Sequence, residues 1–266
     1  MQAIEQLKQI MIDLRNPESG CPWDIQQDFS SIAPYTVEEA YEVADAIERN
    51  DMDELKSELG DLLFQVIFHA QLADEQGLFD FEDVVNQVNE KLVRRHPHVF
   101  AGEKIESTEQ LDQRWEQHKH EERKENSRKK NNEDTPFEGI ASTLPALKWS
   151  HKIQKRAART GFDWPDIWPV FEKLEEELGE LKEEIAHEDN YERILDEFGD
   201  VLFVCVNIAM HVGVDAERSL RHANRKFMSR FITMERLMQC DDKQFSDCNL
   251  ELMEEYWQKA KKQLSS

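Results

Sequence analysis

Apolar residues recur along this chain at the spacing of an α-helix. Ala40, Val43 and Ile47 follow one another at positions i, i+3 and i+7, and the segment 171–185 repeats this spacing. Further helices are expected over residues 59–72, 81–95 and 216–238. The segment 59–72 is apolar on nearly every side, which predicts a helix buried within a bundle. No segment alternates convincingly between polar and apolar residues, so the sequence predicts an all-α fold.

The helical pattern occurs twice. The segments VEEAYEVADAI and KSELGDLLFQVIFHAQ of the first half correspond to LEEELGELKEEI and LDEFGDVLFVCVNIAMH of the second half. Glu58 follows Glu39 by 19 residues, and Glu197 follows Glu177 by 20. The common order and spacing indicate two tandem copies of one helical domain.

The two copies are separated by a charged segment. Residues 120–136, HEERKENSRKKNNEDTP, contain almost no apolar side chains. Such a segment cannot bury enough apolar surface to offset the entropy of ordering it, which is typical of a linker. We therefore expect an N-terminal helical domain over 1–119, a linker over 120–136 and a C-terminal helical domain over 137–266.

The composition narrows the class of protein. The chain has 266 residues, with 33 Lys and Arg against 56 Asp and Glu, which gives a formal charge of −23. Direct binding to nucleic acid is not expected, because phosphate contacts need clustered Lys and Arg. No apolar run is long enough to span a membrane, and the N-terminal segment is amphipathic and charged, unlike a signal core. The four cysteines form no metal-binding pairs and are too few for a disulfide framework, so we expect a cytoplasmic protein.

Carboxylates gather at matching positions of the two copies. Glu39 and Glu42 lie one turn apart on one predicted helix, and Glu177 and Glu180 repeat the pair. On its own, such a pattern is usual on a solvated helix face. The next helix of each copy carries a narrow polar stripe on an otherwise apolar surface, made of Glu58, Asp61, Gln65 and His69 in the first copy and of Asp196, Glu197, Asp200, Asn207 and His211 in the second.

These stripes indicate a metal site. Carboxylates on an apolar helix are costly to bury unless each charge is paired or bound to a metal. Neither 58–71 nor 196–211 contains a Lys or Arg that could neutralise the stripe locally. Metal binding removes this cost, and a ligand set made only of oxygen atoms favours Mg²⁺, or Mn²⁺ in its place.

The motif EExxE, followed by ExxD on the next helix, resembles the MazG family of nucleoside triphosphate pyrophosphohydrolases, within the all-α NTP pyrophosphatase superfamily. The resemblance extends to GCPWD at 20–24, PYTVEEAYEV at 34–43, ELGDLLFQV at 58–66, RRHPHVF at 94–100 and EFGDVLF at 197–203. It implies Mg²⁺-dependent hydrolysis of nucleoside triphosphates to nucleoside monophosphate and pyrophosphate. It also implies broad base tolerance and assembly as a homodimer.

The resemblance implies the metal ligands, and the chemistry that it implies, together with the repeat, suggests roles for further residues. The expected metal ligands are Glu177, Glu180, Glu197 and Asp200, which are matched in the first copy by Glu39, Glu42, Glu58 and Asp61. Glu176 and Glu38 are candidates to activate or orient the attacking water. Candidates to contact the phosphates or stack on the base are Lys226, Arg230, Trp257 and Lys261, with Lys91, Arg95, Trp115 and Lys119 in the first copy. The ordinary alternatives are solvated basic faces and Trp side chains that pack in a core.

Other functions stay open at this point. The same features fit a non-catalytic nucleotide-binding regulator or adaptor, a purely structural scaffold, or a dUTPase-like enzyme restricted to one nucleotide. Of the two copies, the second is expected to be the main catalytic half, because it carries Glu176, Asp196 and Asn207 around its cluster. In the first copy, His69 could gain a positive charge near neutral pH and weaken metal binding.

Overall fold

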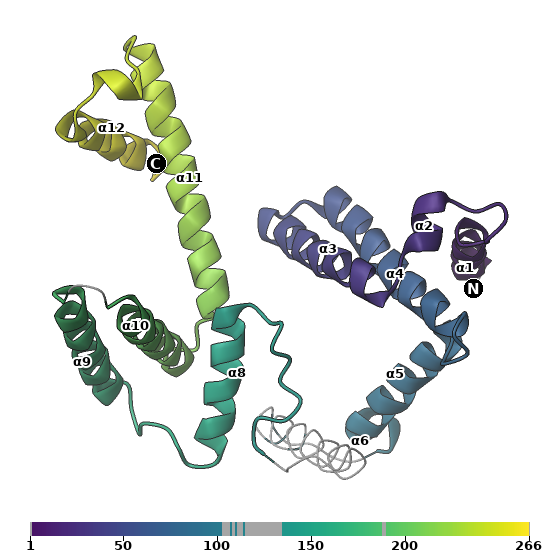
Figure 1. Ribbon diagram of the computed structural model, residues 1–266. Helices are drawn as coiled ribbons and strands as arrows, with labels where there is room; N and C mark the ends of the chain where they lie inside the picture. Colours follow the sequence, from purple (N-terminus) through teal and green to yellow (C-terminus); the bar gives the residue numbers. More distant parts are fainter. Residues whose placement is uncertain are drawn as a thin grey trace. The chain divides into compact units, whose positions relative to one another are not determined.

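The chain forms two compact units, Met1–Lys119 and His120–Ser266. The computed structural model describes residues 2–102, 107, 110, 114, 135–187 and 190–265. These residues form helices joined by turns, and no strand occurs among them (Figure 1). The prediction of an all-α fold is therefore confirmed. Nearly all of the predicted linker 120–136 lies outside the described residues, so its boundaries stay a prediction.

The first unit is built around a helical hairpin. Its helices are α1 (Gln2–Leu14), α2 (Pro22–Gln26), α3 (Phe29–Arg49), α4 (Met52–Asp74), α5 (Phe81–Arg95) and α6 (Pro97–Phe100). Asn50 ends α3 in the left-handed conformation, with φ of 57°. The Asp51 side chain then caps α4 by accepting a hydrogen bond of 3.1 Å from the backbone N–H of Glu54. Because only these two residues separate them, α3 and α4 fold back to lie side by side.

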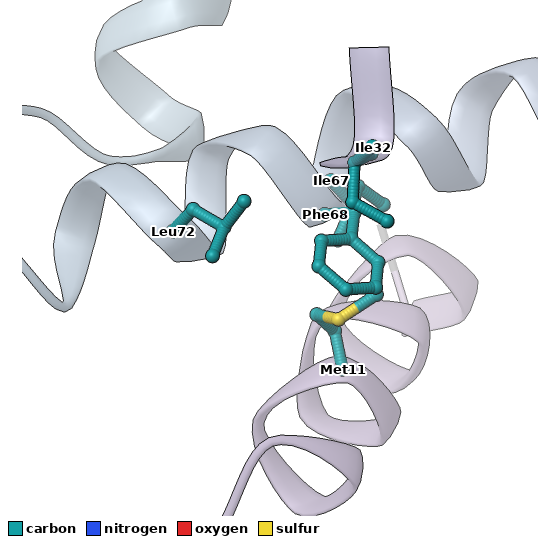
Figure 2. Packing of buried hydrophobic residues seen from close by; sticks show 5 residues of the cluster. All are labelled: Met11, Ile32, Ile67, Phe68 and Leu72. Carbon is teal, nitrogen blue, oxygen red and sulfur yellow. The ribbon is translucent and has the colours of Figure 1, made fainter. Parts of the chain in front are cut away.

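Three helices of the first unit share the core drawn in Figure 2. Met11 of α1, Ile32 of α3, and Ile67, Phe68 and Leu72 of α4 form one cluster of buried side chains. Burial of each such side chain favours folding by about 1.5–3 kcal/mol before the entropy of ordering is subtracted. This core holds α1 against the α3–α4 hairpin.

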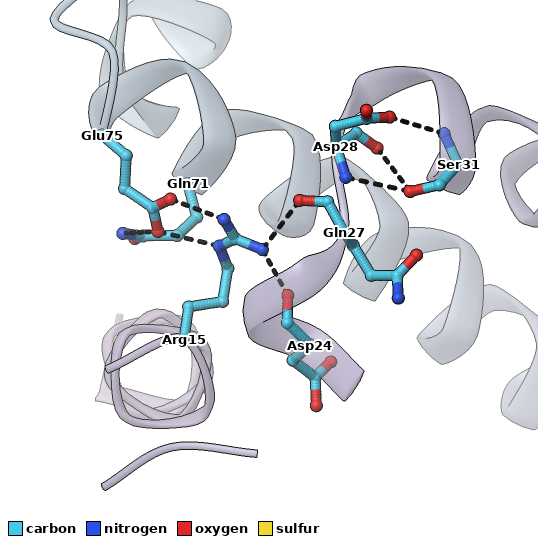
Figure 3. A network of polar contacts seen from close by, with 7 residues as sticks. All are labelled: Arg15, Asp24, Gln27, Asp28, Ser31, Gln71 and Glu75. Atoms are coloured by element: carbon cyan, nitrogen blue, oxygen red, sulfur yellow. Dashed lines mark hydrogen bonds and ion pairs between the residues drawn. The ribbon is translucent and has the colours of Figure 1, made fainter. Parts of the chain in front are cut away.

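A polar network around Arg15 joins α1 to the rest of the first unit (Figure 3). Arg15 Nε donates to Glu75 Oε1 at 2.8 Å, and Arg15 Nη2 lies 2.7 Å from Glu75 Oε2. Arg15 Nη1 also donates to the backbone carbonyls of Asp24 and Gln27 at the end of α2. The guanidinium hydrogen bond lowers the pKa of Glu75, against the opposing effect of its burial. One arginine thus joins the segment after α1, the end of α2 and the end of α4.

The second unit contains α8 (Ala146–Arg159), α9 (Trp168–Ile185), α10 (Tyr191–His211), α11 (Ala216–Cys240), a short 3₁₀ helix η1 (Phe245–Asp247) and α12 (Leu250–Gln263). α10 packs against α9 and α8, and α11 packs against α12. A core cluster between α11 and α12 is made of Met234, Met238, Tyr256 and Ala260. The Tyr256 hydroxyl donates to Asp241 Oδ2 at 2.6 Å, which closes the end of α11 onto α12.

Both long apolar helices leave one side uncovered within their own unit. The prediction of a buried helix over 59–72 holds for one side only: Ile67, Phe68 and Leu72 are buried, whereas Leu59 is 50% exposed. In α10, Phe198 is 50% exposed, and Leu202 and Phe203 are also exposed. The physical reason is that α4 and α10 each pack against the other helices of their unit on one side, and none of the described residues of the same unit covers the opposite side.

None of the described helices is by itself both long and apolar enough to cross a membrane. Only α10 and α11 taken together have the length and composition of a span, and this pair is bent by 104°.

Candidate metal centre

The first carboxylate cluster lies between α3 and α4. Glu39 and Glu42 lie one turn apart on α3, and Glu58 lies on α4, which the hairpin places alongside. The three residues each offer a carboxylate oxygen, and these oxygens lie within 4.8 Å of one another. Asp61, the fourth predicted ligand, is exposed one turn beyond Glu58 and is close enough to raise the pKa of Glu39 and Glu58. The structure therefore brings three of the four predicted first-copy ligands together, with Asp61 close enough to act on them electrostatically.

Burial and mutual repulsion both raise the pKa of carboxylates in the first cluster. Burial raises the pKa of Glu39, and the neighbouring carboxylates of Glu42, Asp61 and Glu58 raise it further. Burial likewise raises the pKa of Glu58, followed by the effects of Glu42 and Asp61. Within the described part of the chain, every cause identified for these two shifts raises the pKa and none lowers it. The first cluster thus holds unrelieved negative charge that a cation would stabilise.

The second cluster has the same construction on α9 and α10. Carboxylate oxygens of Glu177, Glu197 and Asp200 lie within 4.8 Å of one another. Glu177 on α9 is only 5% exposed, so its charge is largely removed from water. Glu180, the fourth predicted ligand, is exposed one turn further along α9 and raises the pKa of Glu197. Burial is the largest cause that raises the pKa of both Glu197 and Asp200.

Basic side chains reach the second cluster, contrary to the expectation from the sequence. Lys173 Nζ on α9 lies 2.8 Å from Glu177 Oε1 and 2.8 Å from Glu176 Oε1. Arg193 Nη2 lies 3.9 Å from Glu197 Oε1 on α10. The sequence argument failed because it considered only the segment 196–211, whereas Lys173 comes from the preceding helix and Arg193 from just before that segment. A Lys four residues before Glu177 was the signal that could have found this contact.

The donor set fits a hard divalent cation. Each cluster offers only carboxylate oxygens, and their separations allow one ion to contact three of them. Mg²⁺ and Mn²⁺ prefer such oxygen ligands, and none of the described residues adds a Cys or His to either group. The residues present therefore fit the predicted cation, while their role as ligands stays a prediction.

The two candidate water-activating residues stand beside the clusters. Glu38 directly precedes Glu39 on α3, and Glu176 directly precedes Glu177 on α9. Both side chains are exposed, and Glu176 is held by its contact with Lys173. They are accessible to a bound water, as their predicted role requires.

The predicted phosphate-binding residues lie on other helices. Lys226 and Arg230 are on α11, and neither is among the described groups that shift the pKa of Glu197 or Asp200. Trp257 of α12 packs against the α11–α12 core, with its ring 5.2 Å from that of Phe227, and Lys261 is exposed. In the first unit Lys91 and Arg95 lie on α5, and the predicted pair Trp115 and Lys119 falls outside the described residues. Within one copy of the second unit, Lys226 and Arg230 are therefore not shown to act on the second carboxylate cluster.

The rest of the polar stripe differs between the copies. His69 Nε2 and Thr36 Oγ1 share a hydrogen bond of 2.9 Å, and burial lowers the pKa of His69. The expectation that His69 gains charge near neutral pH is therefore wrong, because burial disfavours the charged ring. Gln65 and Asn207 are buried, and their side-chain carbonyl oxygens have no hydrogen-bond partner among the described residues.

Comparison with known proteins places this arrangement in a family. The family model for the MazG nucleotide pyrophosphohydrolase domain matches residues 27–100 and 170–232, one segment in each copy, and both carboxylate clusters lie inside these segments. The chain belongs to the MazG nucleotide pyrophosphohydrolase family. The tandem MazG-like organisation predicted from the sequence is thereby confirmed.

Relatives of similar length strengthen the MazG assignment. The nucleoside triphosphate pyrophosphohydrolase of Escherichia coli K12 is 47% identical over 99% of this chain and 98% of its own. The nucleoside triphosphate pyrophosphohydrolase/pyrophosphatase MazG of Thermotoga maritima is 45% identical over 97% of this chain and 95% of its own. The crystal structure of a mazG-related protein from Thermotoga maritima aligns with 43% of this chain and 97% of its own, at a TM-score of 0.37 and 32% identity. Likeness over nearly the whole length to these two nucleoside triphosphate pyrophosphohydrolases agrees with the family model.

Proposed function

We propose that this protein hydrolyses nucleoside triphosphates to nucleoside monophosphates and pyrophosphate, that the reaction depends on Mg²⁺, and that it tolerates different bases. The observation that carries the proposal is the pair of clusters in which three carboxylates lie within 4.8 Å of one another. Family membership and the names of the Escherichia coli and Thermotoga maritima relatives support the reaction type.

Two groups of residues have distinct roles in the proposed reaction: one binds the metal ion and the other accepts the proton from water. Glu177, Glu180, Glu197 and Asp200 would hold Mg²⁺ in the second copy, and Glu39, Glu42, Glu58 and Asp61 would hold it in the first. When bound, the ion supplies positive charge to the phosphate oxygens and orients the reacting groups. Glu176 or Glu38 accepts a proton from water as the water oxygen bonds to the α-phosphorus. The bond from that phosphorus to the bridging oxygen breaks, and pyrophosphate leaves.

Assembly as a homodimer is part of the proposal. Phe198, Leu202 and Phe203 of α10 expose apolar surface that needs a cover in water. In one protomer, Lys226 and Arg230 of α11 are not among the groups that influence the second cluster. A second copy covering α10 would bury the apolar face and could bring these cations to the carboxylates. Sedimentation equilibrium of the full chain measures this assembly directly.

Turnover separates this function from its rivals. The purified chain is incubated with each of the common NTPs, dNTPs and dUTP in Mg²⁺, and the products are separated by anion-exchange chromatography. Monophosphate and pyrophosphate in equal amounts from several nucleotides are expected, with loss of activity in EDTA and recovery on adding Mg²⁺. Hydrolysis of dUTP alone would establish the restricted enzyme, and binding without products would establish the regulator. Full activity after exhaustive chelation would overturn the metal dependence.

A further inference from the structure

Lys173 contacts a carboxylate that a metal ion bound by the second cluster would also contact. Its ammonium lies 2.8 Å from one carboxylate oxygen of Glu177, which is almost fully buried, and 2.8 Å from one of Glu176, which is exposed. Both contacts are made along α9, at spacings of four and three residues, so the helix itself sets them. The contacts with these glutamates raise the pKa of Lys173, so the ammonium stays charged at neutral pH.

The first cluster has no such residue at the matching position. Glu39 corresponds to Glu177, and the residue four places earlier is Tyr35. The Tyr35 ring packs edge-on against Trp23, with ring centres 5.9 Å apart. Burial and the neighbouring carboxylates raise the pKa of Asp200, and Lys173 opposes this rise, whereas the causes at Glu39 all raise its pKa. The two copies therefore share a carboxylate geometry, but only the second has a cation at this position of the motif. Arg193, 3.9 Å from Glu197, is a second and more distant cation near the second cluster.

We propose that Lys173 is a positioning residue of the second cluster, a resident counter-ion that holds Glu176 and Glu177 in place before a divalent cation binds. The first cluster has Tyr35 at this position, and among the described residues no cation acts on the pKa of Glu39 or Glu58, so a bound divalent cation would supply the balancing charge. The inference rests on the proposed function, because Glu176 is the candidate water-activating group and Glu177 a candidate ligand.

This arrangement has a consequence that a structural ion pair would not have. The ammonium and a divalent cation share Glu177, so each opposes the binding of the other. Replacing Lys173 with an uncharged residue should strengthen metal binding to the second cluster, while Glu176 loses the contact that orients it and turnover slows. Placing an ammonium at Tyr35 should weaken metal binding to the first cluster. Affinity and turnover then move in opposite directions in Lys173→Met.

The test uses the full chain and measures Mn²⁺ binding by electron paramagnetic resonance alongside NTP turnover. A Glu39→Gln, Glu58→Gln background silences the first cluster so that binding reports on the second. In this background Lys173→Met should bind Mn²⁺ about threefold or more tightly, a change of about 0.7 kcal/mol. Its kcat should fall by about tenfold with little change in KM, which is the signature of a group acting after substrate binds.

Two further variants on α9 serve as controls. Lys182→Met removes an exposed lysine of the same helix, and it should leave both readouts unchanged. Lys173→Arg keeps the charge and should retain the wild-type Mn²⁺ affinity and most of the turnover. Because Arg preserves the ion pair, this variant also remains informative if Lys173→Met does not fold.

Each remaining result decides the question. Equal losses of Mn²⁺ affinity and turnover in Lys173→Met, or unchanged affinity in a folded Lys173→Met, would overturn the counter-ion role. Equal losses of affinity and turnover in Lys173→Arg would do the same. Tighter Mn²⁺ binding by Lys173→Met in a protein that hydrolyses no nucleotide would support the counter-ion and overturn the proposed function alone. Absence of Mn²⁺ binding in every variant would overturn both.

The reciprocal variant Tyr35→Lys tests the first cluster, in a Glu177→Gln, Glu197→Gln background that silences the second. It should bind Mn²⁺ more weakly than that background, and equal or tighter binding would contradict the proposal.

Discussion

Arg15 and Glu75, sixty positions apart in the sequence, form a two-pronged ion pair in which Nε and Nη2 lie 2.8 and 2.7 Å from the two carboxylate oxygens. The Arg15 side chain is nearly buried, and its third nitrogen binds the carbonyls that end α2. Such paired charge-assisted hydrogen bonds are among the stronger polar contacts in proteins. This pair links the segment after α1 to the end of α4.

The first prediction concerns the pH dependence of this pair. The pKa of Glu75 is lowered below its ordinary value of 4.5, so its contribution to stability is present above that value and is lost as the pH falls through the lowered pKa. Glu75→Gln should reduce the free energy of unfolding of the first unit at pH 7 by about 1 kcal/mol, allowing for solvent screening. The difference from wild type should vanish in strongly acidic solution. Thermal melts from pH 7 to pH 2 measure it, and Asp74→Asn, at the exposed preceding carboxylate, is the control. A difference that persists in acid would show that the loss is not electrostatic.

The second prediction concerns the core in Figure 2. Phe68 has no exposed surface and packs among side chains from α1, α3 and α4. Phe68→Ala should reduce the free energy of unfolding by about 3–5 kcal/mol, because it removes buried surface and leaves a cavity. Urea denaturation followed by circular dichroism measures the change. Phe79→Ala, at a Phe that is 43% exposed, should have a much smaller effect. Equal effects would mean that Phe68 is not central to this core.

The third prediction concerns the first cluster without metal. Glu39 has a raised pKa, so its ionised form at pH 7 is disfavoured in the folded state, and removing that charge should stabilise the fold. In EDTA, Glu39→Gln should therefore melt at a higher temperature than the wild type. Adding Mg²⁺ should raise the melting temperature of the wild type more than that of the variant, because binding relieves the repulsion only where it exists. Differential scanning calorimetry measures both shifts. An identical rise in the two proteins would place the cation elsewhere.

The fourth prediction concerns the division of labour between the copies. Glu177 is almost fully buried in the second cluster, and Lys173 orients the adjacent Glu176. Glu177→Gln should remove nearly all turnover, whereas Glu39→Gln should leave most of it. The two variants are matched because each replaces the same motif position, and folding is checked by circular dichroism. If Glu39→Gln removed most of the activity and Glu177→Gln were tolerated, the first copy would be the catalytic half. Halving by each variant would mean two independent sites.

Local periodicity was enough to predict the long helices α3, α4, α5, α9, α10 and α11 and the grouping of the carboxylates, whereas α8 and α12 were not predicted. α5 begins at Phe81 and ends at Arg95, as the apolar spacing predicts. Helix geometry places Glu39 and Glu42 on one side of α3, and the hairpin turn at Asn50 and Asp51 then brings Glu58 of α4 alongside them. The contact of Lys173 with Glu177 obeys the same local rule, and it was missed because neutralising charges were sought only on the helix that follows.

The sequence by itself therefore determined the helical class, the tandem repeat and the two acidic groups, since each depends on residues related by a fixed helical period. Only the tertiary structure decided how Arg15 finds Glu75, how burial keeps His69 from gaining charge, and that one face of α4 and of α10 stays uncovered within its own unit. These features depend on which helices pack together and on how much water each side chain loses. Periodicity shows which side of a helix is apolar, but it does not show which partner covers that side.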